Sequence, residues 1–333
     1  MRIKLQNIGM LSEANVKLDG LTVIAGENDT GKSTVGKALY FLQYRRSKED
    51  DADGKLFSKV FRVKNNQFLT FGQSSGNMSL LDNDNKNLIE YTISGTRKSK
   101  TKNKTKHKVF YIESPMAMNL AQYITTSESI RSSESYTSTL PFYIFDLIMR
   151  MKEEAIESDE PENSDSIIND VISVIKTEVN GSIIYDSEKD DFFFIKDQLP
   201  NTRIPMVCTA SGIKMFGFLQ ILLANDSLKD GSVLILDEPE VHLHPKWQLK
   251  YAEIIVELVK NGVTVLVNSH SPYMVQALKV YSDRNEAVKK SSNFYIAVKN
   301  LDQITSTIKD TTKDLNPIFK ALAQPLHDIV WAK

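Results

Sequence analysis

The chain has 333 residues, of which 41% are hydrophobic and 25% are charged, and its formal net charge is -1. This length and composition place it among globular proteins with a substantial core, organised as one large domain or two ordinary ones. No apolar run approaches the roughly 20 residues of a membrane-spanning helix, and residues 1–7 enter a strand pattern rather than a signal peptide, so we expect a cytoplasmic protein without a membrane partner.

Two local features stand out against this average. The single cysteine, Cys208, excludes an internal disulfide and a zinc finger, and its apolar neighbours predict a buried position. The near-zero net charge conceals two opposed blocks, because residues 97–108 contain seven Lys or Arg residues and residues 153–165 contain seven Asp or Glu residues. Each block therefore carries its own prediction about partners.

The N-terminal residues predict strands that lead into a glycine-rich loop. Apolar residues in alternating or continuous runs, with turns at Gly9 and Gly20, predict three strands, at residues 3–7, 14–17 and 21–25. After the loop, small and apolar side chains at helical spacing predict a helix over residues 32–43. The order of strand, glycine-rich loop and helix is the context in which phosphate-binding loops occur.

The middle of the chain divides into a sheet-forming part and a helical part. Residues 45–108 are polar with strand-like pieces and predict antiparallel sheet, followed by a buried strand at residues 109–113. Residues 116–179 are predicted to be helical and are interrupted by an acidic linker that contains Pro161. The individual predictions are strands at residues 67–71 and 88–94, helices at residues 140–151 and 167–175, and a hairpin over residues 183–195.

The last third of the chain alternates strands with helices. Strands are predicted at residues 233–236, 263–267 and 293–298, and helices at residues 246–260 and from Tyr273 onward. Such alternation predicts a parallel sheet covered by helices. The predicted fold class is therefore α/β, with a mixed sheet, an antiparallel region and a helical insertion.

The glycine-rich loop has the pattern Gly, four residues, Gly-Lys-Ser. Its glycines permit a tight curve, and its amide N–H groups together with the N-terminus of the following helix favour phosphate. We expect Lys32 to contact the β and γ phosphates of ATP, Ser33 to place its hydroxyl on Mg²⁺, and Thr34 to reach the α phosphate. The residues predicted to bind nucleotide here are Asn28, Asp29, Thr30, Gly31, Lys32, Ser33 and Thr34.

A second polar site follows the apolar strand at residues 233–236. Asp237 and Glu238 stand at the carboxyl end of this strand, where open α/β sheets bind ligands. Asp237 suits Mg²⁺, directly or in its second shell, and Glu238 is positioned as general base for the water that attacks the γ phosphate. Lys32 and Asp237 lie 205 positions apart, so a large insertion separates the two halves of the predicted site.

Together these segments resemble the ABC-type ATPase superfamily, in particular its RecF, SMC and OLD-like branch of AAA-family proteins from prokaryotic defence-type systems. The resemblance rests on the P-loop, on Asp237 and Glu238, and on residues 211–212, 239–245 and 268–272. All of these lie within about the first 45 and the last 135 residues. The resemblance implies an ATPase core at residues 1–115 and 200–333, with a helical insertion and acidic linker at residues 116–199.

The resemblance also implies roles that spacing alone leaves open. Ser211 and Gly212 match the signature loop that contacts the γ phosphate held by the other subunit of a dimer, although a Ser-Gly pair before a helix is also an ordinary N-cap. His270 matches the switch histidine that contacts the γ phosphate. Residues 242–245 fall where these ATPases keep the loop that crosses the dimer interface, and the two histidines in this segment lack the further ligands of a zinc site.

The sequence departs from the family pattern at two places. Glu113, Ser114 and Pro115 stand after the strand at residues 109–113, where the family's Q-loop glutamine would come. This leaves the link from the nucleotide to the helical insertion open. The signature loop lacks the double glycine and glutamine of membrane transporters, which argues against a transporter subunit.

The two charge blocks and the end of the chain bear on partners. Alternating lysines in the run from Arg97 to Lys108 would neutralise the phosphates of DNA, which RecF- and SMC-like heads bind, but a solvated hairpin tip explains the run equally well. The acidic block is interpreted as a solvated tether. Because 63 residues follow His270, we expect no OLD-type nuclease domain, and analogy with two-component defence systems implies a separate effector protein, either a nuclease or a toxin.

The leading hypothesis is an ATPase that forms a homodimer around two Mg-ATP and controls DNA or an effector protein, in anti-phage defence or DNA maintenance. The alternative is a nucleotide-gated scaffold that binds ATP, hydrolyses little of it and restrains a toxic or nuclease partner. Glu238→Gln separates the two hypotheses, because it stops turnover in the first and leaves the second unchanged.

Overall fold

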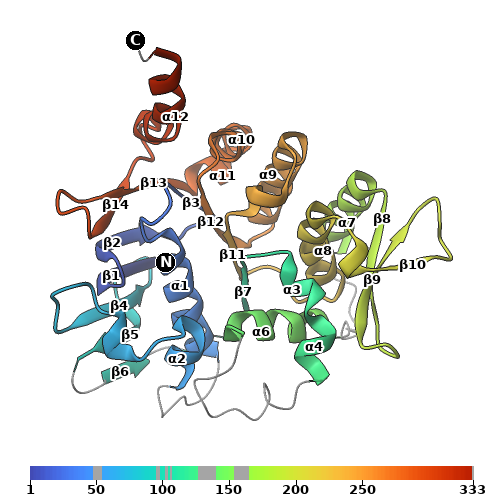
Figure 1. Cartoon of the computed structure of the whole chain (residues 1–333), viewed down its shortest axis with the longest axis horizontal. Helices are drawn as coiled ribbons and strands as arrows, with labels where there is room; N and C mark the ends of the chain where they lie inside the picture. The colour runs from blue at the N-terminus through green and yellow to red at the C-terminus, as the bar shows by residue number, and fades with distance from the viewer. Residues whose placement is uncertain are drawn as a thin grey trace.

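The computed structural model describes residues 1–47, 55–94, 98–101, 104–105, 107–126, 140–153 and 165–331. Its main feature is an 11-stranded mixed sheet, accompanied by a separate three-stranded sheet. Helices cover the large sheet, and Figure 1 shows the small sheet to one side of it. The α/β class with a mixed sheet, predicted from the sequence, is confirmed.

One part of the large sheet is parallel and contains the strand that leads into the P-loop. Its strands, in spatial order, are β13 (Ser292–Lys299), β3 (Leu21–Ala25), β12 (Thr264–Ser269), β11 (Val233–Asp237) and β7 (Val109–Ile112). Every residue of β3, β11 and β7 is buried, because this part of the sheet is covered on both faces. The predicted strands in this part are confirmed, with ends that differ by at most two residues.

The other part of the sheet is mostly antiparallel. The strand β14 (Ser306–Asp310) joins the two parts, since it pairs antiparallel with β13 and parallel with β2. Beyond it follow β2 (Leu11–Lys17), β1 (Arg2–Ile8), β4 (Gly76–Leu81), β5 (Asn87–Ile93) and the edge strand β6 (Lys98–Thr101). The predicted antiparallel sheet is confirmed, and β14 was not predicted.

Helices divide between the two faces of the sheet. The helices α1 (Lys32–Ser47) and α2 (Lys55–Phe61) cover one face, and α9 (Pro245–Lys260) and α10 (Pro272–Asp283) cover the other, with α8 (Ser211–Ala224) packed into the same core. Adjacent residues of β3 show the alternation, because Val23 belongs to the core under α9 and α10 and Ile24 to the core under α1. Two further helices, α11 (Glu286–Lys290) and α12 (Asn316–Trp331), flank β13 and β14 in sequence. Among the described residues, every helix is too short or too polar to cross a bilayer.

A mixed helix and strand segment lies between β7 and β11. It contains α3 (Met116–Asn119), α4 (Ala121–Thr126), α6 (Phe142–Met151), α7 (Asp165–Val179) and the small sheet of β8 (Gly181–Asp186), β9 (Asp191–Lys196) and β10 (Arg203–Pro205). Figure 1 shows this segment together with α8 on one side of the large sheet. The two predicted helices and the hairpin are confirmed, while the domain boundaries at residues 115 and 200 stay a prediction.

The strand predicted at residues 67–71 is wrong. The chain forms a 3-10 helix η1 (Asn65–Phe68) there, and Phe68 packs its ring 4.5 Å from the ring of Phe61 in α2. Only Leu69 makes a bridge, to Ile8, while Phe71 is 82% exposed. The alternation of apolar residues that suggested a strand therefore serves aromatic packing against α2, a helix that the sequence did not predict.

The buried position predicted for Cys208 is also wrong. Cys208 ends a short 3-10 helix η2 (Met206–Cys208) and is exposed. Successive side chains of such a turn point in different directions, so that Met206 is 1% exposed while Val207 is 66% exposed. Apolar neighbours in sequence therefore do not bury this thiol.

Candidate nucleotide-binding site

The loop after β3 can be formed only with its glycines. Gly26 and Gly31 have φ angles of +151° and +84°, and a Cβ atom on them would lie 2.6 Å from the carbonyl oxygen of Ala297 and 2.8 Å from the Leu11 side chain. Larger residues would meet both a conformational and a steric barrier at these positions. The chain therefore turns sharply from β3 and enters α1 at Lys32.

This loop encloses a pocket of about 310 Å³. The pocket is lined by Met10, Asn28, Asp29, Thr30, Gly31, Lys32, Ser33, Thr34 and Glu238. All seven residues that the sequence assigned to the nucleotide within the loop thus line one cavity, and the predicted base Glu238 joins them. A pocket at the start of a helix, where amide N–H groups are unpaired, favours a phosphate group.

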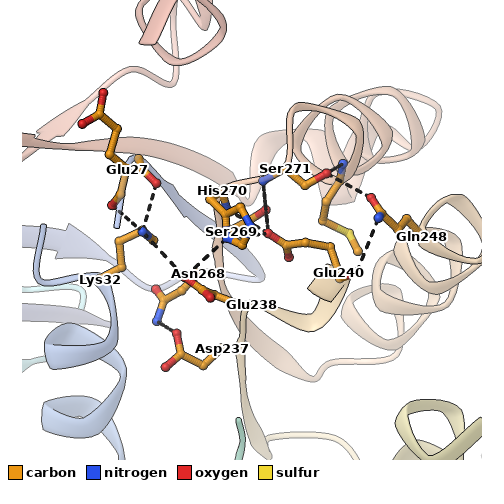
Figure 2. A network of polar contacts seen from close by, with 12 residues as sticks. Glu27, Lys32, Asp237, Glu238, Glu240, Gln248, Asn268, Ser269, His270 and Ser271 are labelled. Atoms are coloured by element: carbon orange, nitrogen blue, oxygen red, sulfur yellow. Dashed lines mark hydrogen bonds and ion pairs between the residues drawn. The ribbon is translucent and has the colours of Figure 1, made fainter. Parts of the chain in front are cut away.

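Lys32 lies inside the loop rather than in solvent. Its Nζ donates to the carbonyl oxygens of Gly26 and Glu27 at 2.9 Å and 2.7 Å, and it lies 3.9 Å from Glu238 Oε1 (Figure 2). Burial lowers the pKa of this ammonium group, and the carboxylates of Glu238 and Asp237 oppose that effect. The cation is therefore held at the centre of the loop, close to the carboxylates that end β11.

Asp237 is held by two neutral donors from the strands on either side of β11. Tyr111 Oη in β7 donates to Oδ2 at 2.5 Å, and Asn268 Nδ2 in β12 donates to Oδ1 at 2.9 Å. Asp237 is 4% exposed, so both bonds lie in a low-dielectric environment and orient the carboxylate strongly. Burial and the Asp237 carboxylate raise the pKa of Tyr111, which keeps its hydroxyl a proton donor.

Glu238 occupies a left-handed backbone conformation, with φ 51° and ψ 50°. Its amide N–H donates to the carbonyl oxygen of Asn268 at 2.9 Å, which fixes the turn. A glutamate in this region carries a cost of about 1–3 kcal/mol, and such strain concentrates at functional sites. The turn directs the Glu238 carboxylate toward Lys32 of the P-loop, so that Glu238 lines the pocket while the neighbouring Asp237 does not.

His270 and Glu240 complete this group of side chains. His270 follows β12, and its Nδ1 lies 3.4 Å from Glu238 Oε1 and 3.5 Å from Glu240 Oε1. Glu240 belongs to the 3-10 helix η3 (Pro239–His242) and is 4% exposed. Figure 2 shows these residues between Lys32 and the start of α10.

The predicted signature residues lie elsewhere. Ser211 and Gly212 begin α8 and do not line the pocket of about 310 Å³. A Cβ atom on Gly212 would lie 2.5 Å from the Trp247 ring, so the glycine lets the helix start approach α9 closely. The structure therefore brings together the P-loop, Asp237, Glu238 and His270, but not the signature pair.

The two histidines after η3 have separate surroundings. His244 caps α9, because its Nδ1 accepts the Lys246 N–H at 3.3 Å, and the side chain of His242 is exposed. Over the described ranges, no three His, Cys, Asp or Glu side chains are grouped in a way that could hold a metal ion by themselves. A Mg²⁺ in this pocket would therefore share its coordination with ligand oxygens and water.

Sequence reasoning assigned no role to several residues around the site. Glu113 stands where the family's Q-loop was expected, and its carboxylate accepts a hydrogen bond from Lys37 Nζ in α1 at 3.2 Å and from Tyr143 Oη in α6 at 2.5 Å. The sequence did not indicate a role for Tyr111, since a tyrosine within a predicted buried strand has the pattern of a core residue. Glu240 follows Asp237 and Glu238 within three residues, and this third acidic residue could have been predicted from the sequence to belong near the site.

Only part of the basic block, residues 97–108, lies within the described residues. Residues 98–101 form β6 at the edge of the sheet, and residues 95–97, 102–103 and 106 lie outside the described residues. Lys108 Nζ is engaged within the chain, 2.8 Å from Glu153 Oε2 and 3.2 Å from Ser227 Oγ. Residues 154–164 of the acidic block also lie outside the described residues. DNA binding through residues 97–108 stays a prediction.

Family models match most of the chain. A model described as an AAA domain matches residues 2–202, which is more than half of the chain. A second AAA-domain model, whose description refers to the AbiEii toxin and a type IV toxin–antitoxin system, matches residues 138–276. The two matches together include the P-loop, Asp237 at the end of β11 and His270 directly after β12.

Curated proteins and solved structures similar to the chain include two proteins of defence systems or phages and an SMC head. The Septu protein PtuA of Bacillus thuringiensis is 31% identical over 114 residues, covering 31% of this chain and 28% of PtuA. The Old nuclease of Escherichia phage P2 is 30% identical over 96 residues, covering 28% of this chain and 16% of the nuclease. These alignments therefore span less than a third of either relative.

The solved structure is an SMC head bound to the C-winged helix domain of ScpA. It aligns with a TM-score of 0.55 at 12% identity, covering 96% of this chain and 98% of that one. At this identity the likeness concerns the fold alone. The alignment covers the P-loop part of the chain, the insertion and the part that contains β11.

Proposed function

Because the chain belongs to the AAA-domain family of P-loop ATPases, we propose that it binds ATP with Mg²⁺ in the pocket described above and hydrolyses the γ phosphate. The observation that carries this proposal is a contiguous line of three side chains. Lys32 Nζ lies 3.9 Å from Glu238 Oε1, and the same oxygen lies 3.4 Å from His270 Nδ1. A cation for phosphate oxygens and a carboxylate base thus line one pocket, and an imidazole lies beside the carboxylate.

The residues at the pocket fit a hydrated Mg²⁺. Ser33 lines the pocket, and each carboxylate oxygen of Asp237 accepts one hydrogen bond and retains further lone-pair capacity. Ser33 and Asp237 would hold the ion, Asp237 directly or through water. When bound, Mg²⁺ would neutralise the negative charge that develops on the phosphate during hydrolysis.

The protein side chains then divide the chemical work. Lys32 binds phosphate oxygens, and the loop from Asn28 to Thr34 orients the nucleotide through its amide N–H groups and hydroxyls. Glu238 accepts the proton of the attacking water, and its placement on the pocket wall supports this role. His270, which lies next to Glu238, stabilises charge at the γ phosphate.

A second copy of the chain would complete the site. Ser211 and Gly212 lie outside the chain's own pocket, and the start of α8 presents amide N–H groups that suit a phosphate. We propose that the start of α8 of one copy covers the nucleotide of the other, in a homodimer with two composite sites. The opening and closing of this dimer would transmit the state of the nucleotide.

The dimer would act on DNA or on a separate effector protein in the cytoplasm, in anti-phage defence or DNA maintenance. The alignments with the PtuA and Old proteins support this assignment for the ATPase part alone, since they span 28% and 16% of those proteins. The basic run from Arg97 to Lys108 is the proposed DNA contact, with Lys108 less available because it pairs with Glu153.

A second candidate function is a nucleotide-gated scaffold that restrains a toxic or nuclease partner and hydrolyses little ATP. The family model that refers to a toxin–antitoxin system favours it. The two functions differ in what Glu238→Gln does. Loss of turnover with ATP binding retained supports the ATPase, whereas unchanged behaviour supports the scaffold.

The deciding experiment is ATP turnover of the purified chain as a function of its concentration, with and without double-stranded DNA. Lys32→Ala serves as the blank, and Glu238→Gln tests the base. Turnover that rises more than linearly with concentration is expected for a composite dimer site, and stimulation by DNA for the basic run. Tight ATP binding without turnover under every condition would contradict the ATPase and leave the scaffold.

A further inference from the structure

Glu240 is a buried carboxylate that organises the loop carrying His270. Its Oε1 accepts three hydrogen bonds, from Ser269 Oγ and the His270 N–H at 2.8 Å and from the Ser271 N–H at 3.1 Å. Two of the three donors are backbone groups, so the carboxylate fixes the path of the main chain as well as a side chain. Figure 2 shows Glu240 between the loop and α9.

The same loop is tied to α9 through Gln248. Ser271 Oγ donates to Gln248 Oε1 at 3.0 Å, and Gln248 Nε2 donates to the carbonyl oxygens of Leu243 at 3.1 Å and Glu240 at 3.4 Å. Three consecutive stretches of the fold therefore meet at one side chain: η3, the start of α9 and the end of β12. A movement of η3 would be passed directly to the backbone of His270.

Apolar packing does not explain a carboxylate in this place. Glu240 is 4% exposed, and its second oxygen, Oε2, is buried and has no hydrogen-bond partner among the described residues. Burying such a group is costly unless it makes specific bonds. The bonds it does make lie at the N-terminus of α10, where the positive end of the helix dipole offsets part of that cost.

The third observation is the position of the imidazole. His270 Nδ1 is buried, has no hydrogen-bond partner among the described residues, and lies 3.4 Å from Glu238 Oε1 and 3.5 Å from Glu240 Oε1. These separations are longer than an ordinary N–H···O bond, and such bonds at active sites often shorten when the ligand is present. A shift of the loop by a fraction of an ångström would decide whether His270 reaches Glu238.

We propose that Glu240 is a positioning residue for the hydrolytic reaction. Through its three bonds to the loop after β12 it holds His270 beside Glu238, and through η3 it links this placement to the segment that follows Asp237 and Glu238. The inference rests on the proposed ATPase function. It adds that the reaction requires a side chain long enough to reach the three donors of this loop.

Three substitutions separate length from charge. Glu240→Gln keeps an oxygen at the position of Oε1 and places the amide nitrogen at the position of Oε2, which has no hydrogen-bond partner among the described residues. Glu240→Asp keeps the charge but is one methylene shorter and cannot reach all three donors. Glu240→Ala removes the acceptor altogether and leaves the His270 N–H unpaired, whereas the Ser271 N–H still reaches Ser269 Oγ at 3.0 Å.

The matched control is Asp186→Ala. Asp186 is also a buried carboxylate, 8% exposed, that accepts two backbone N–H groups, from Glu188 and Lys189. It lies at the end of β8 in the small sheet and does not line the nucleotide pocket. It therefore reports the effect of removing a loop-binding carboxylate that is unconnected to His270.

The experiment measures kcat, KM and ATP affinity for the full chain and these four variants. Glu240→Ala and Glu240→Asp are expected to lower kcat about 10- to 100-fold, because a catalytic group displaced by about 1 Å loses that much. ATP affinity is expected to stay close to wild type, since Glu240 does not line the pocket. Glu240→Gln is expected to recover most of the lost turnover, and Asp186→Ala to keep the wild-type kcat.

A wild-type kcat in Glu240→Asp would overturn the proposal. An active Glu240→Asp together with an inactive Glu240→Gln would also overturn it, because the reaction would then depend on the charge of this side chain. If Glu240→Ala does not fold, the contrast between Asp and Gln decides. Amide hydrogen exchange at His270 and Ser271 gives a readout that needs no turnover, and it is expected to accelerate in the Asp variant and not in the Gln variant. If the wild type does not hydrolyse ATP, the proposed function fails, while the exchange result still decides whether Glu240 holds the loop.

Discussion

Tyr111 and Asp237, 126 positions apart in the sequence, share a buried hydrogen bond of 2.5 Å in which the tyrosine hydroxyl donates to Oδ2. Tyr111 lies in β7 and Asp237 ends β11, and the two strands are parallel neighbours in the sheet. With Asn268 on the other side, the carboxylate is held from both flanking strands. The direction in which Asp237 faces is therefore set by the sheet and not by its own strand alone.

Tyr111→Phe is expected to weaken the use of Mg²⁺. Removal of the hydroxyl leaves Oδ2 without its donor, and groups that orient a metal-binding carboxylate typically contribute about 10- to 100-fold to metal affinity or activity. The measurement is ATP turnover against Mg²⁺ concentration, in which the variant should need more Mg²⁺ for half-maximal rate.

Tyr251→Phe is the control for this substitution. Tyr251 is fully buried, and its hydroxyl donates to the Met215 carbonyl oxygen at 3.4 Å on the other face of the sheet. It should lose some stability and keep the wild-type dependence on Mg²⁺. An unchanged Mg²⁺ dependence in Tyr111→Phe would show that Asn268 alone orients Asp237.

Gly31→Ala is expected to abolish ATP binding. Gly31 has φ +84°, and a Cβ atom there would lie 2.8 Å from the Leu11 side chain, so the loop must change shape. Gly72→Ala is the matched control, since Gly72 has φ +78° with nothing within 4 Å of its Cβ position. In both variants the left-handed backbone conformation costs about 1 kcal/mol or more. Only Gly31→Ala should lose binding of a fluorescent ATP analogue. Equal affinities in the two variants would contradict the role of the loop.

Stability is expected to fall in alkaline solution because of buried tyrosines. Burial raises the pKa of Tyr44 from 10.0 to about 12, with Asp146 adding to the effect. The unfolded chain therefore loses this proton near pH 10, while the folded chain keeps it to about pH 12. The stabilisation is fully present below pH 10 and is lost as the pH rises toward 12. Burial raises the pKa in the same direction for Tyr40, Tyr111, Tyr143 and Tyr251.

Urea unfolding at pH 8 and at pH 11 measures this loss. Each tyrosine that titrates only in the unfolded state contributes a slope of up to about 1.4 kcal/mol per pH unit. Tyr44→Phe should make the fall in the free energy of unfolding shallower than in wild type. An identical pH dependence in the two proteins would mean that Tyr44 ionises freely in the folded chain.

The sequence by itself determined the nucleotide loop and the class of fold. Gly31 and Lys32 could be assigned because the P-loop is local. Its glycines, its lysine and the start of the following helix lie within eight residues, and their roles depend on backbone geometry that the residue types impose. The strand before Asp237 could be assigned for a similar reason, since a continuous apolar run ending in two carboxylates describes a buried parallel strand.

Tertiary structure decided which side chains surround those carboxylates. Tyr111 and Glu240 bind Asp237 and the His270 loop only because parallel strands distant in sequence are brought side by side, and no local pattern records that pairing. Packing against α2 likewise determined the 3-10 helix at Phe68, and the turn before α8 determined the exposure of Cys208. In both places tertiary contacts override the apolar pattern of a few residues. Short segments have too little apolar surface to determine their own conformation, whereas the P-loop owes its shape to glycines that permit it and exclude alternatives.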